Sequence, residues 1–423
     1  MIAILNKIFS KSKNLNSIDF VFEKLKKKLK IEKIFNSVEE FSENSEIRYV
    51  GGCVRKILNN EETDDIDLAV NLNPSELSKV LKKNSIKFYS TGIEHGTITA
   101  LIDKKKFEIT SLREDVITDG RHAKVKFSSN WKEDASRRDF TINAVYADIN
   151  GNLFDPFDGK KDIENGKVKF IGDPEKRIRE DYLRILRYIR FFLIYSKNKH
   201  DPEILRIIRK NLDGISKISS ERLLDEFKKL VYSRGFLKLN EDSFSVEIIK
   251  LIFPQFKNIS VFKNLNKFAM EEIYNFDFAF FLSILVIDGS DNADYFIYKF
   301  NISKKDQKRI IFLNNFYSNI NSKTFTIRNL SKIFYFDGKQ SLLDLLYFQI
   351  FKSKKIDKKM INFIDHFKDK EPPILPLRAI TLMTKYNIPE GKELGEKLKK
   401  IENKWVDNNF KISESEVQEI LKN

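Results

Sequence analysis

From about residue 137 to the C-terminus, almost every segment of this chain carries apolar residues at helical spacing. The stretch before it differs, because short apolar runs typical of strands alternate there with helical patterns. The sequence therefore predicts an α+β fold, with a small module of strands and helices at residues 46–165 and a long helical remainder. A length of 423 residues, at roughly 150 per domain, agrees with two to four domains.

The elements of the module follow from the same patterns. Residues 18–42 form an amphipathic helical preface, and the polar residues 114–135 predict a mobile loop. The turn DKKK (103–106) joins its two flanking strands into a hairpin. The predicted strands are 47–52, 65–70, 86–91, 96–102 and 106–113, and the predicted helices are 53–60 and 74–84.

Charge and cysteine content narrow the class of protein. The chain has 76 Lys and Arg against 61 Asp and Glu, a net charge of +15, which favours a polyanionic partner, nucleic acid first. A single cysteine, Cys53, excludes an internal disulfide framework and a multi-thiolate zinc site. The apolar run 278–287 is about half of a membrane span, and the first residues lack the features of a signal peptide. We therefore expect a cytoplasmic protein.

The first chemical motif combines paired glycines with paired carboxylates. Asp65 and Asp67 are two residues apart on a predicted strand and point to one side. Such carboxylates repel unless a cation lies between them, and Mg²⁺ suits oxygen ligands. Gly51 and Gly52 precede a helix and let backbone N–H groups approach a phosphate, while Arg55 adds a cation. These are parts of a nucleotidyl-transfer site, although each half alone is also common on protein surfaces.

A third carboxylate is expected beside the pair, to help bind the metal that activates the attacking hydroxyl. Glu108 is the candidate, because it alternates with Phe107 and Ile109 on a predicted strand. The same alternation also fits the outer face of an ordinary amphipathic strand, and the sequence leaves both interpretations open.

The second motif, SRRDFTINA (136–144), is dense in polar groups. Arg137 and Arg138 offer bidentate contacts to a triphosphate. Asp139 and Asn143 are four residues apart on a predicted helix, where Asn143 can hold a ribose hydroxyl or the loop. A capped helix start with a salt bridge is the alternative interpretation.

The third motif, EDYLRILRYIRF (180–191), predicts recognition of a base. Asp181 and Arg184 are three residues apart on a predicted helix, and Arg187 and Arg190 continue the spacing. A carboxylate accepts from the exocyclic amino group of cytosine or adenine while a guanidinium donates to the adjacent ring nitrogen. Uracil and guanine present the reverse order. The alternative is a basic helix face with an internal ion pair worth a few tenths of a kcal/mol.

In this order the motifs resemble the class II tRNA nucleotidyltransferase and bacterial poly(A) polymerase family, within the DNA polymerase β-like nucleotidyltransferase superfamily. The resemblance covers roughly residues 46–231. The matching stretches are YVGGCVRKIL (49–58), DDIDLAV (64–70), FEITSLR (107–113), DGRHAKVKF (119–127), SRRDFTINAVYAD (136–148), LFDPFDGKKDIENGKVKFIGDP (153–174), EDYLRILRYIRF (180–191) and ISSERLLDEFKKLV (218–231).

The resemblance implies addition of CMP, CMP and AMP to the 3′ end of tRNA, from CTP and ATP with Mg²⁺ and without a template. The first motif of the family usually reads GGxVRD, and Lys56 stands here in place of the acid, so an ion pair from that position is not carried over. Carried over by position, Asp65 and Asp67 bind metal, and Gly52 and Arg55 contact the triphosphate. A flexible loop needed for the change from CTP to ATP contains Asp119, Gly120 and Arg121. Arg138 and Asn143 lie beside the nucleotide, Asp181 and Arg184 read the base with Arg187 close by, and Glu221 and Arg222 support the neck.

The resemblance also implies a domain order in which a small head with a mixed sheet is followed by an elongated all-α neck, body and tail. The expected parts are an N-terminal helical extension (1–45), a catalytic head (46–165), a helical neck with base recognition (166–232) and an RNA-binding helical body and tail (233–423). No residue of the last part is assigned to a site, because its basic helices suit RNA contact and plain solvation equally.

The product is the remaining question. Poly(A) polymerases share these motifs but usually carry a longer GRRF-type stretch before the FEIT-like strand. Residues 92–110 are compact here and lack it, which favours CCA addition. Poly(A) tailing and partial addition of only C or only A stay open. A catalytically inactive RNA-binding protein is the third possibility, and the intact pair Asp65 and Asp67 argues against it.

Overall fold

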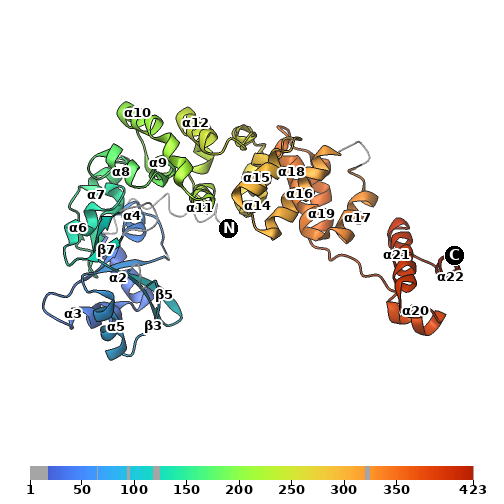
Figure 1. Ribbon diagram of the computed structural model, residues 1–423, viewed down its shortest axis with the longest axis horizontal. Coiled ribbons are helices and arrows are strands. Elements are labelled where there is room, and N and C mark those ends of the chain that lie inside the picture. Colours follow the sequence, from blue (N-terminus) through green and yellow to red (C-terminus); the bar gives the residue numbers. More distant parts are fainter. Residues whose placement is uncertain (1–17, 64, 93–95, 118–123, 320–323, 423) are drawn as a thin grey trace. The chain divides into compact units, whose positions relative to one another are not determined.

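The computed structural model describes residues 18–63, 65–92, 96–117, 124–319 and 324–422. It divides into two compact units, Met1–Phe236 and Leu237–Asn423 (Figure 1). The described part of the first unit holds the strands, and that of the second is helical. The finer division of the first unit into extension, head and neck stays a prediction.

The main sheet of the first unit is mixed, as predicted. Its strands lie in the order β3-β4-β5-β2-β1-β8-β9. Strands β2 and β5 are parallel, and the other neighbouring pairs are antiparallel. The strands are β1 (Ile47–Val50), β2 (Asp67–Val70), β3 (Lys87–Gly92), β4 (Thr97–Ile102), β5 (Lys105–Ser111), β8 (Tyr146–Ala147) and β9 (Leu153–Phe154).

The predicted hairpin is confirmed, because β4 and β5 pair across a turn at Asp103 and Lys104, both with positive φ. Two other predictions are wrong in part. Strands β8 and β9 lie where almost every segment was predicted to be helical, because two-residue strands are too short to show a period. Strands β6 (Arg113–Ile117) and β7 (Lys124–Phe127) pair within the predicted loop, whose residues 118–123 lie outside the described part.

The core of the sheet is covered by the predicted preface. Helices α2 (Ile18–Leu29) and α3 (Glu32–Glu39) share one apolar cluster with α5 (Pro74–Lys83) and the strands. The ring of the buried Tyr49 on β1 lies 5.2 Å from that of Phe22 and 5.0 Å from that of Phe35. Asn73 begins α5 with a reciprocal capping box to Glu76.

Helices and 3₁₀ turns next to the sheet carry the other residues of the site. Helix α4 (Gly52–Leu58) follows β1 directly, and α6 (Trp131–Ser136) precedes the 3₁₀ turn η2 (Thr141–Asn143). Two of the helices after the sheet, α8 and α10, begin where an Asp side chain caps the backbone and proline follows, at Asp173 and Asp201. These elements are α7 (Gly159–Glu164), α8 (Pro174–Glu180), α9 (Leu183–Tyr195), α10 (Pro202–Lys210), η3 (Leu212–Lys217) and α11 (Ser220–Val231).

The second unit has a core rich in phenylalanine. Helix α14 is almost entirely buried, so the apolar run 278–287 is a core helix. Across the described residues, no helix combines the length and apolarity needed to cross a bilayer. The elements are η4 (Phe236–Glu241), α12 (Ser243–Ile252), η5 (Ile259–Lys263), α13 (Lys267–Glu272), η6 (Ile273–Asn275), α14 (Phe278–Val286), α15 (Asn292–Phe300), α16 (Lys304–Ser318), α17 (Ile327–Phe336), α18 (Gly338–Lys352), α19 (Lys358–Phe367), α20 (Ala379–Tyr386), α21 (Lys392–Asp407) and α22 (Glu414–Lys422).

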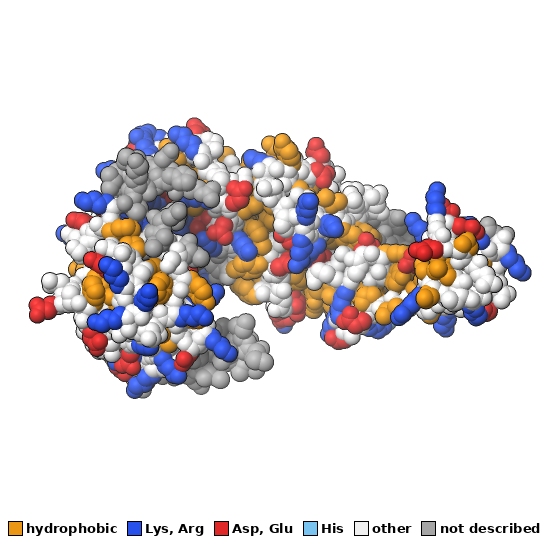
Figure 2. Space-filling view, turned by 60° about the horizontal axis from the view of Figure 1, so that its bottom comes forward, with side chains coloured by type: hydrophobic (Ala, Val, Ile, Leu, Met, Phe, Trp, Pro, Cys, Tyr) orange, Lys and Arg blue, Asp and Glu red, His pale blue; other side chains and the backbone are white. Residues whose placement is uncertain are grey.

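On the face drawn in Figure 2, Lys and Arg side chains are interspersed with Asp and Glu instead of gathering into one continuous patch. Charge on this face therefore does not mark a binding site.

Candidate active site

Three carboxylates lie near the start of strand β2, close enough for their charges to act on one another. Asp67 is its first residue and pairs in register with Glu108 on the parallel strand β5. Asp65 precedes the strand and is exposed, so the prediction that both aspartates lie on the strand is wrong for Asp65. Burial raises the pKa of Asp67 above its ordinary value, and the charges of Asp65 and Glu108 raise it further, against a lowering by Arg138 and Arg55.

This repulsion fits a site for a divalent cation, because a cation would relieve it and hard cations prefer carboxylate oxygens. Within the described residues, no group of three or more Asp, Glu, Cys or His side chains is already gathered tightly enough to hold an ion. The fit of Asp65, Asp67 and Glu108 therefore rests on their donor chemistry and on the raised pKa of Asp67.

Gly51 and Gly52 form the turn from β1 into α4. Gly51 has a φ of 70°, in the left-handed region that favours glycine. A Cβ atom on Gly51 would lie 3.5 Å from Nη1 of Arg138, and one on Gly52 would lie 4.0 Å from Oδ2 of Asp67. The turn thus brings bare backbone next to an arginine and a carboxylate, an arrangement suited to binding a phosphate beside a metal.

Asp134 holds the arginines of the second motif. The Nε of Arg138 donates to Oδ2 of Asp134 at 3.2 Å and to the hydroxyl of Tyr146 at 3.0 Å, and Tyr146 donates to Asp134 at 2.7 Å. The Nε of Arg137 donates to Oδ1 of Asp134 at 2.9 Å. Burial raises the pKa of Asp134, but the two arginines outweigh it and lower the pKa to about 2. The ionised carboxylate therefore fixes both guanidinium groups.

A chain of hydrogen bonds joins all three motifs. Arg55 donates through Nη1 to Oδ1 of Asn143, and Nδ2 of Asn143 donates to Oδ1 of Asp139 at 2.8 Å. The Nε and Nη2 of Arg187 lie 2.8 and 2.6 Å from Oδ2 of Asp139. Burial opposes the charge of Asp139, but Arg187 outweighs it and the pKa falls to about 2. Residues predicted separately thus form one network.

The backbone of the second motif differs from the prediction. Asp139 and Asn143 do not share an α-helix, because α6 ends at Ser136 and Asn143 closes the 3₁₀ turn η2. Between them the buried Phe140 is extended and bridges Phe170. The hydrogen bond between Asp139 and Asn143 forms nevertheless.

Asp181 and Arg184 do not share a helix either, and that prediction is wrong. Helix α8 ends at Glu180, Asp181 is extended, and its Oδ1 accepts from the backbone N–H of Leu183 at 3.2 Å. The two side chains bind different partners. Oδ2 of Asp181 accepts from Nη2 of Arg222 at 2.8 Å, and Nη1 of Arg184 donates to Glu180 at 2.8 Å.

The break between α8 and α9 lies against the second motif. Arg177 on α8 donates to the backbone carbonyls of Arg137 and Arg138. Nη2 of Arg184 lies 3.4 Å from the carbonyl of Arg137, and Asp181 is near enough to raise the pKa of Arg187, against the effect of burial. The structure therefore brings the predicted base-reading residues to the predicted triphosphate residues.

Four residues with structural roles at the site were not assigned from the sequence: Asp134, Tyr146, Glu180 and Glu226. Helical spacing offered a signal for one of them, since Asp134 is three and four residues before the paired arginines. The arginines that Glu226 binds lie on another helix, so local spacing does not indicate its role. Glu180 stands inside a quoted motif, whereas nothing local to Tyr146 indicates its role.

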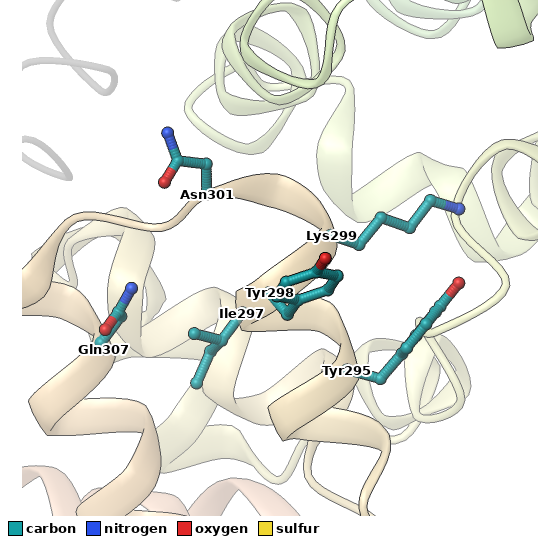
Figure 3. A pocket seen from close by; sticks show the side chains of 6 residues that line it. All are labelled: Tyr295, Ile297, Tyr298, Lys299, Asn301 and Gln307. Atoms are coloured by element: carbon teal, nitrogen blue, oxygen red, sulfur yellow. The ribbon is translucent and has the colours of Figure 1, made fainter.

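The remaining predicted loop and two surface hollows supply none of the site residues named above. The loop residues Asp119, Gly120 and Arg121 lie outside the described residues. A hollow of about 580 Å³ on the second unit contains none of the predicted residues; Figure 3 shows Tyr298 and Tyr295 beside it on α15. Another, of about 410 Å³, is lined by Tyr182, the residue after Asp181.

Comparisons with known proteins agree with this geometry. A family model described as "Poly A polymerase head domain" matches residues 47–169, and one described as "Probable RNA and SrmB-binding site of polymerase A" matches residues 199–259. The chain is 30% identical over 385 residues to a CCA-adding enzyme of Lactococcus lactis subsp. cremoris. This match covers 88% of this chain and 92% of the relative.

Two further relatives are similar over different lengths. The human protein named "CCA tRNA nucleotidyltransferase 1, mitochondrial" is 46% identical over 192 residues, or 45% of this chain and 44% of the human protein. The match therefore spans less than half of that relative. The crystal structure of the Bacillus stearothermophilus CCA-adding enzyme in complex with CTP is 20% identical, with a TM-score of 0.66 over 90% of this chain and 93% of that chain.

Proposed function

Because the chain belongs to the family of CCA-adding enzymes, we propose that it adds CCA to the 3′ end of tRNA, using CTP and ATP without a template. One observation carries the proposal. The hydrogen-bonded chain from Arg55 through Asn143 and Asp139 to Arg187 joins a glycine turn beside a carboxylate to the segment expected to read the base. A triphosphate and a base can thus be held by one rigid network.

The proposed reaction is an in-line displacement. The 3′ hydroxyl of the RNA attacks the α-phosphate of CTP or ATP, and pyrophosphate leaves. Arg138 beside Gly51 and Arg55 beside Gly52 offset the negative charge of the triphosphate. Asp134 keeps Arg138 in place, and Asn143 keeps Arg55 in place, so little reorganisation is needed during the reaction.

Nucleotidyltransferases of this kind generally depend on a divalent metal. We propose Mg²⁺, held by Asp65 and Asp67 with Glu108 beside them. When bound, such an ion stabilises charge on the attacking and leaving oxygens. The raised pKa of Asp67 supports this assignment, because a carboxylate with like charges around it gains most from a cation.

Base selection falls to Asp181 and Arg184 in this proposal. Arg222 and the backbone of Leu183 orient the Asp181 carboxylate, whose oxygens keep lone pairs for an exocyclic amino group. Glu180 orients Arg184, which donates to the ring nitrogen. Cytosine and adenine fit this order of donor and acceptor, and uracil and guanine do not.

Two other functions use the same nucleotidyl-transfer chemistry. Poly(A) tailing of RNA has the support of the head-domain description "Poly A polymerase", and partial addition of C or A uses the same chemistry. The compact strands β3, β4 and β5, joined without a long insertion, favour CCA addition.

Incubation with tRNA transcripts lacking CCA, given each nucleoside triphosphate singly and in pairs, distinguishes the products. We expect two CMP additions with CTP alone and one further AMP when ATP is added. Long tails of A from ATP alone would overturn the proposal in favour of poly(A) synthesis, and incorporation of C only or A only would reduce it to partial addition.

Three further assignments are proposals of the same kind. The helical second unit is proposed to contact RNA backbone, and a cytoplasmic location is proposed from the scarcity of cysteine. Cell fractionation tests the location, since one matched relative is named as mitochondrial. The domain bounds at 46–165 and 166–232 are tested by limited proteolysis.

A further inference from the structure

Glu226, on helix α11, is among the most deeply buried charged side chains described, with 1% of its surface exposed. A buried carboxylate is costly unless it is paired and hydrogen-bonded. Two of its partners come from the neighbouring helix α9: Oε1 accepts from Nε of Arg190, and Oε2 lies 3.5 Å from Nη1 of Arg187. A third, Lys229, is on α11 itself, with its Nζ 3.9 Å from Oε2.

Arg187 is therefore held from two sides. Its Nε and Nη2 bind Asp139, and its Nη1 faces Glu226. Asp139 in turn holds Asn143, and Asn143 holds Arg55. A change at Glu226 can thus reach Arg55, the residue proposed to contact the triphosphate, through a series of direct side-chain contacts.

Three arginines lie close together in this network, so the negative charge of Glu226 is needed to offset their repulsion. The guanidinium carbons of Arg190, Arg55 and Arg187 lie 4.2, 4.8 and 5.4 Å from the ring centre of Phe191. Burial lowers the pKa of Arg190, and the charges of Arg187 and Arg55 lower it further, against the effect of Glu226. Without Glu226, Arg190 would lose the carboxylate that accepts its hydrogen bond, and Arg187 would keep its hydrogen bond to Asp139 alone on one side, beside two other cations that repel it.

We propose that Glu226 is a positioning residue for nucleotide binding: it holds Arg187 and Arg190 apart and in register, and thereby fixes Asp139, Asn143 and Arg55 against the incoming triphosphate. This inference rests on the proposed function, and it assigns to α11 a role in substrate affinity beyond packing. Glu226 itself touches no substrate in this account.

The test compares Glu226→Gln with Asp225→Asn in the full-length protein. Asp225 is the preceding residue of α11, is 62% exposed and pairs with Lys229 at 2.8 Å, so it controls for loss of one charge from this helix. We expect Glu226→Gln to raise the KM for both CTP and ATP about tenfold or more, with kcat and the KM for tRNA changed less than about threefold. Asp225→Asn should match the wild type, and Glu226→Asp should recover part of the affinity.

Two results would overturn the proposal. The first is an unchanged or lower nucleotide KM in Glu226→Gln, since added positive charge without misplacement would attract a triphosphate more strongly. The second concerns folding. If Glu226→Gln is unstable, the double variant Arg190→Met/Glu226→Met replaces the buried pair by apolar groups and should restore stability. The proposal requires that its nucleotide KM stays raised, and full recovery of the KM would show a purely structural role.

Direct titration separates this inference from the proposed function. Calorimetric binding of ATP and of CTP to wild type, Glu226→Gln and Asp225→Asn requires no tRNA turnover. If the wild type binds these nucleotides but does not extend tRNA, the proposed function fails while the Glu226 comparison can still be read. Equal nucleotide affinity in all three proteins would contradict the positioning role.

Discussion

The two units of the molecule differ in how many charged side chains they bury. Among the described residues, six charged side chains less than a tenth exposed lie in the first unit, against one in the second. The second unit buries Asp344, paired with Arg309 at 2.7 Å, within a phenylalanine-rich core. The six of the first unit are Arg55, Asp134, Asp139, Asp162, Arg177 and Glu226.

Burying charge is unfavourable, so a small cluster such as Arg309 with Asp344 and Asp277 can be a local solution to packing. A connected network of arginines and carboxylates next to exposed carboxylates instead keeps functional groups in fixed positions. Loss of a carboxylate should therefore change nucleotide binding in the first unit but only stability in the second.

The largest effect is expected for loss of a carboxylate at the end of β2. Asp67→Ala should lower nucleotide incorporation by about 10³-fold or more, because transition-state charge would lose its cation. Binding of tRNA, measured by filter retention, should persist within about twofold. An equal loss of tRNA binding would contradict the metal-binding role of Asp67.

The next effect is on stability. Asp134→Asn should lower the free energy of unfolding by about 3 kcal/mol, because it leaves Arg137 and Arg138 without their buried counter-charge. The matched variant in the second unit, Asp344→Asn, should also destabilise but leave the KM for CTP unchanged, whereas Asp134→Asn should raise it. Urea unfolding and steady-state kinetics check both. Equal kinetic effects would remove the contrast between the two units.

Acid should remove part of the stability that this network gives to the fold. The pKa of Asp134 and of Asp139 is about 2 in the folded protein, against about 3.9 for an unperturbed aspartate. The unfolded chain therefore takes up protons first, and the stabilisation is present above about pH 4 and lost as the pH falls toward 2. We expect about 2 kcal/mol for each group, seen as a smaller pH slope of unfolding in Asp134→Asn. An unchanged slope would contradict the ionised state of Asp134.

The smallest effect is on choice of base. Asp181→Ala should reduce discrimination against UTP and GTP by about tenfold, with folding intact because Asp181 is partly exposed. Arg222→Gln should show part of this effect, since Arg222 orients Asp181. Misincorporation into tRNA lacking CCA measures it. Unchanged discrimination in Asp181→Ala would count against recognition of the base edge.

The sequence predicted what depends on short-range pattern. The hairpin of β4 and β5 followed from alternation and a DKKK turn, and the parallel partner of β2 proved to be the strand that carries Glu108. Motif order also identified residues that the hydrogen-bonded network brings together, such as Arg55 and Asn143.

What the sequence missed depends on partners distant in the chain. The helix break at Asp181 is accompanied by contacts of Arg177 with the carbonyls of Arg137 and Arg138, and no local pattern reveals such contacts. The 3₁₀ turn at Asn143 follows an extended Phe140 that bridges Phe170. The role of Glu226 required knowing that α11 packs against α9.

The most direct measurement of the central claim is a crystal structure with CTP and manganese, whose anomalous signal locates the ion. We predict an ion coordinated by carboxylate oxygens of Asp65 and Asp67 and by the α-phosphate, with Arg55 or Arg138 on the triphosphate. Bound CTP with the two carboxylates turned apart and no anomalous signal near them would contradict the account.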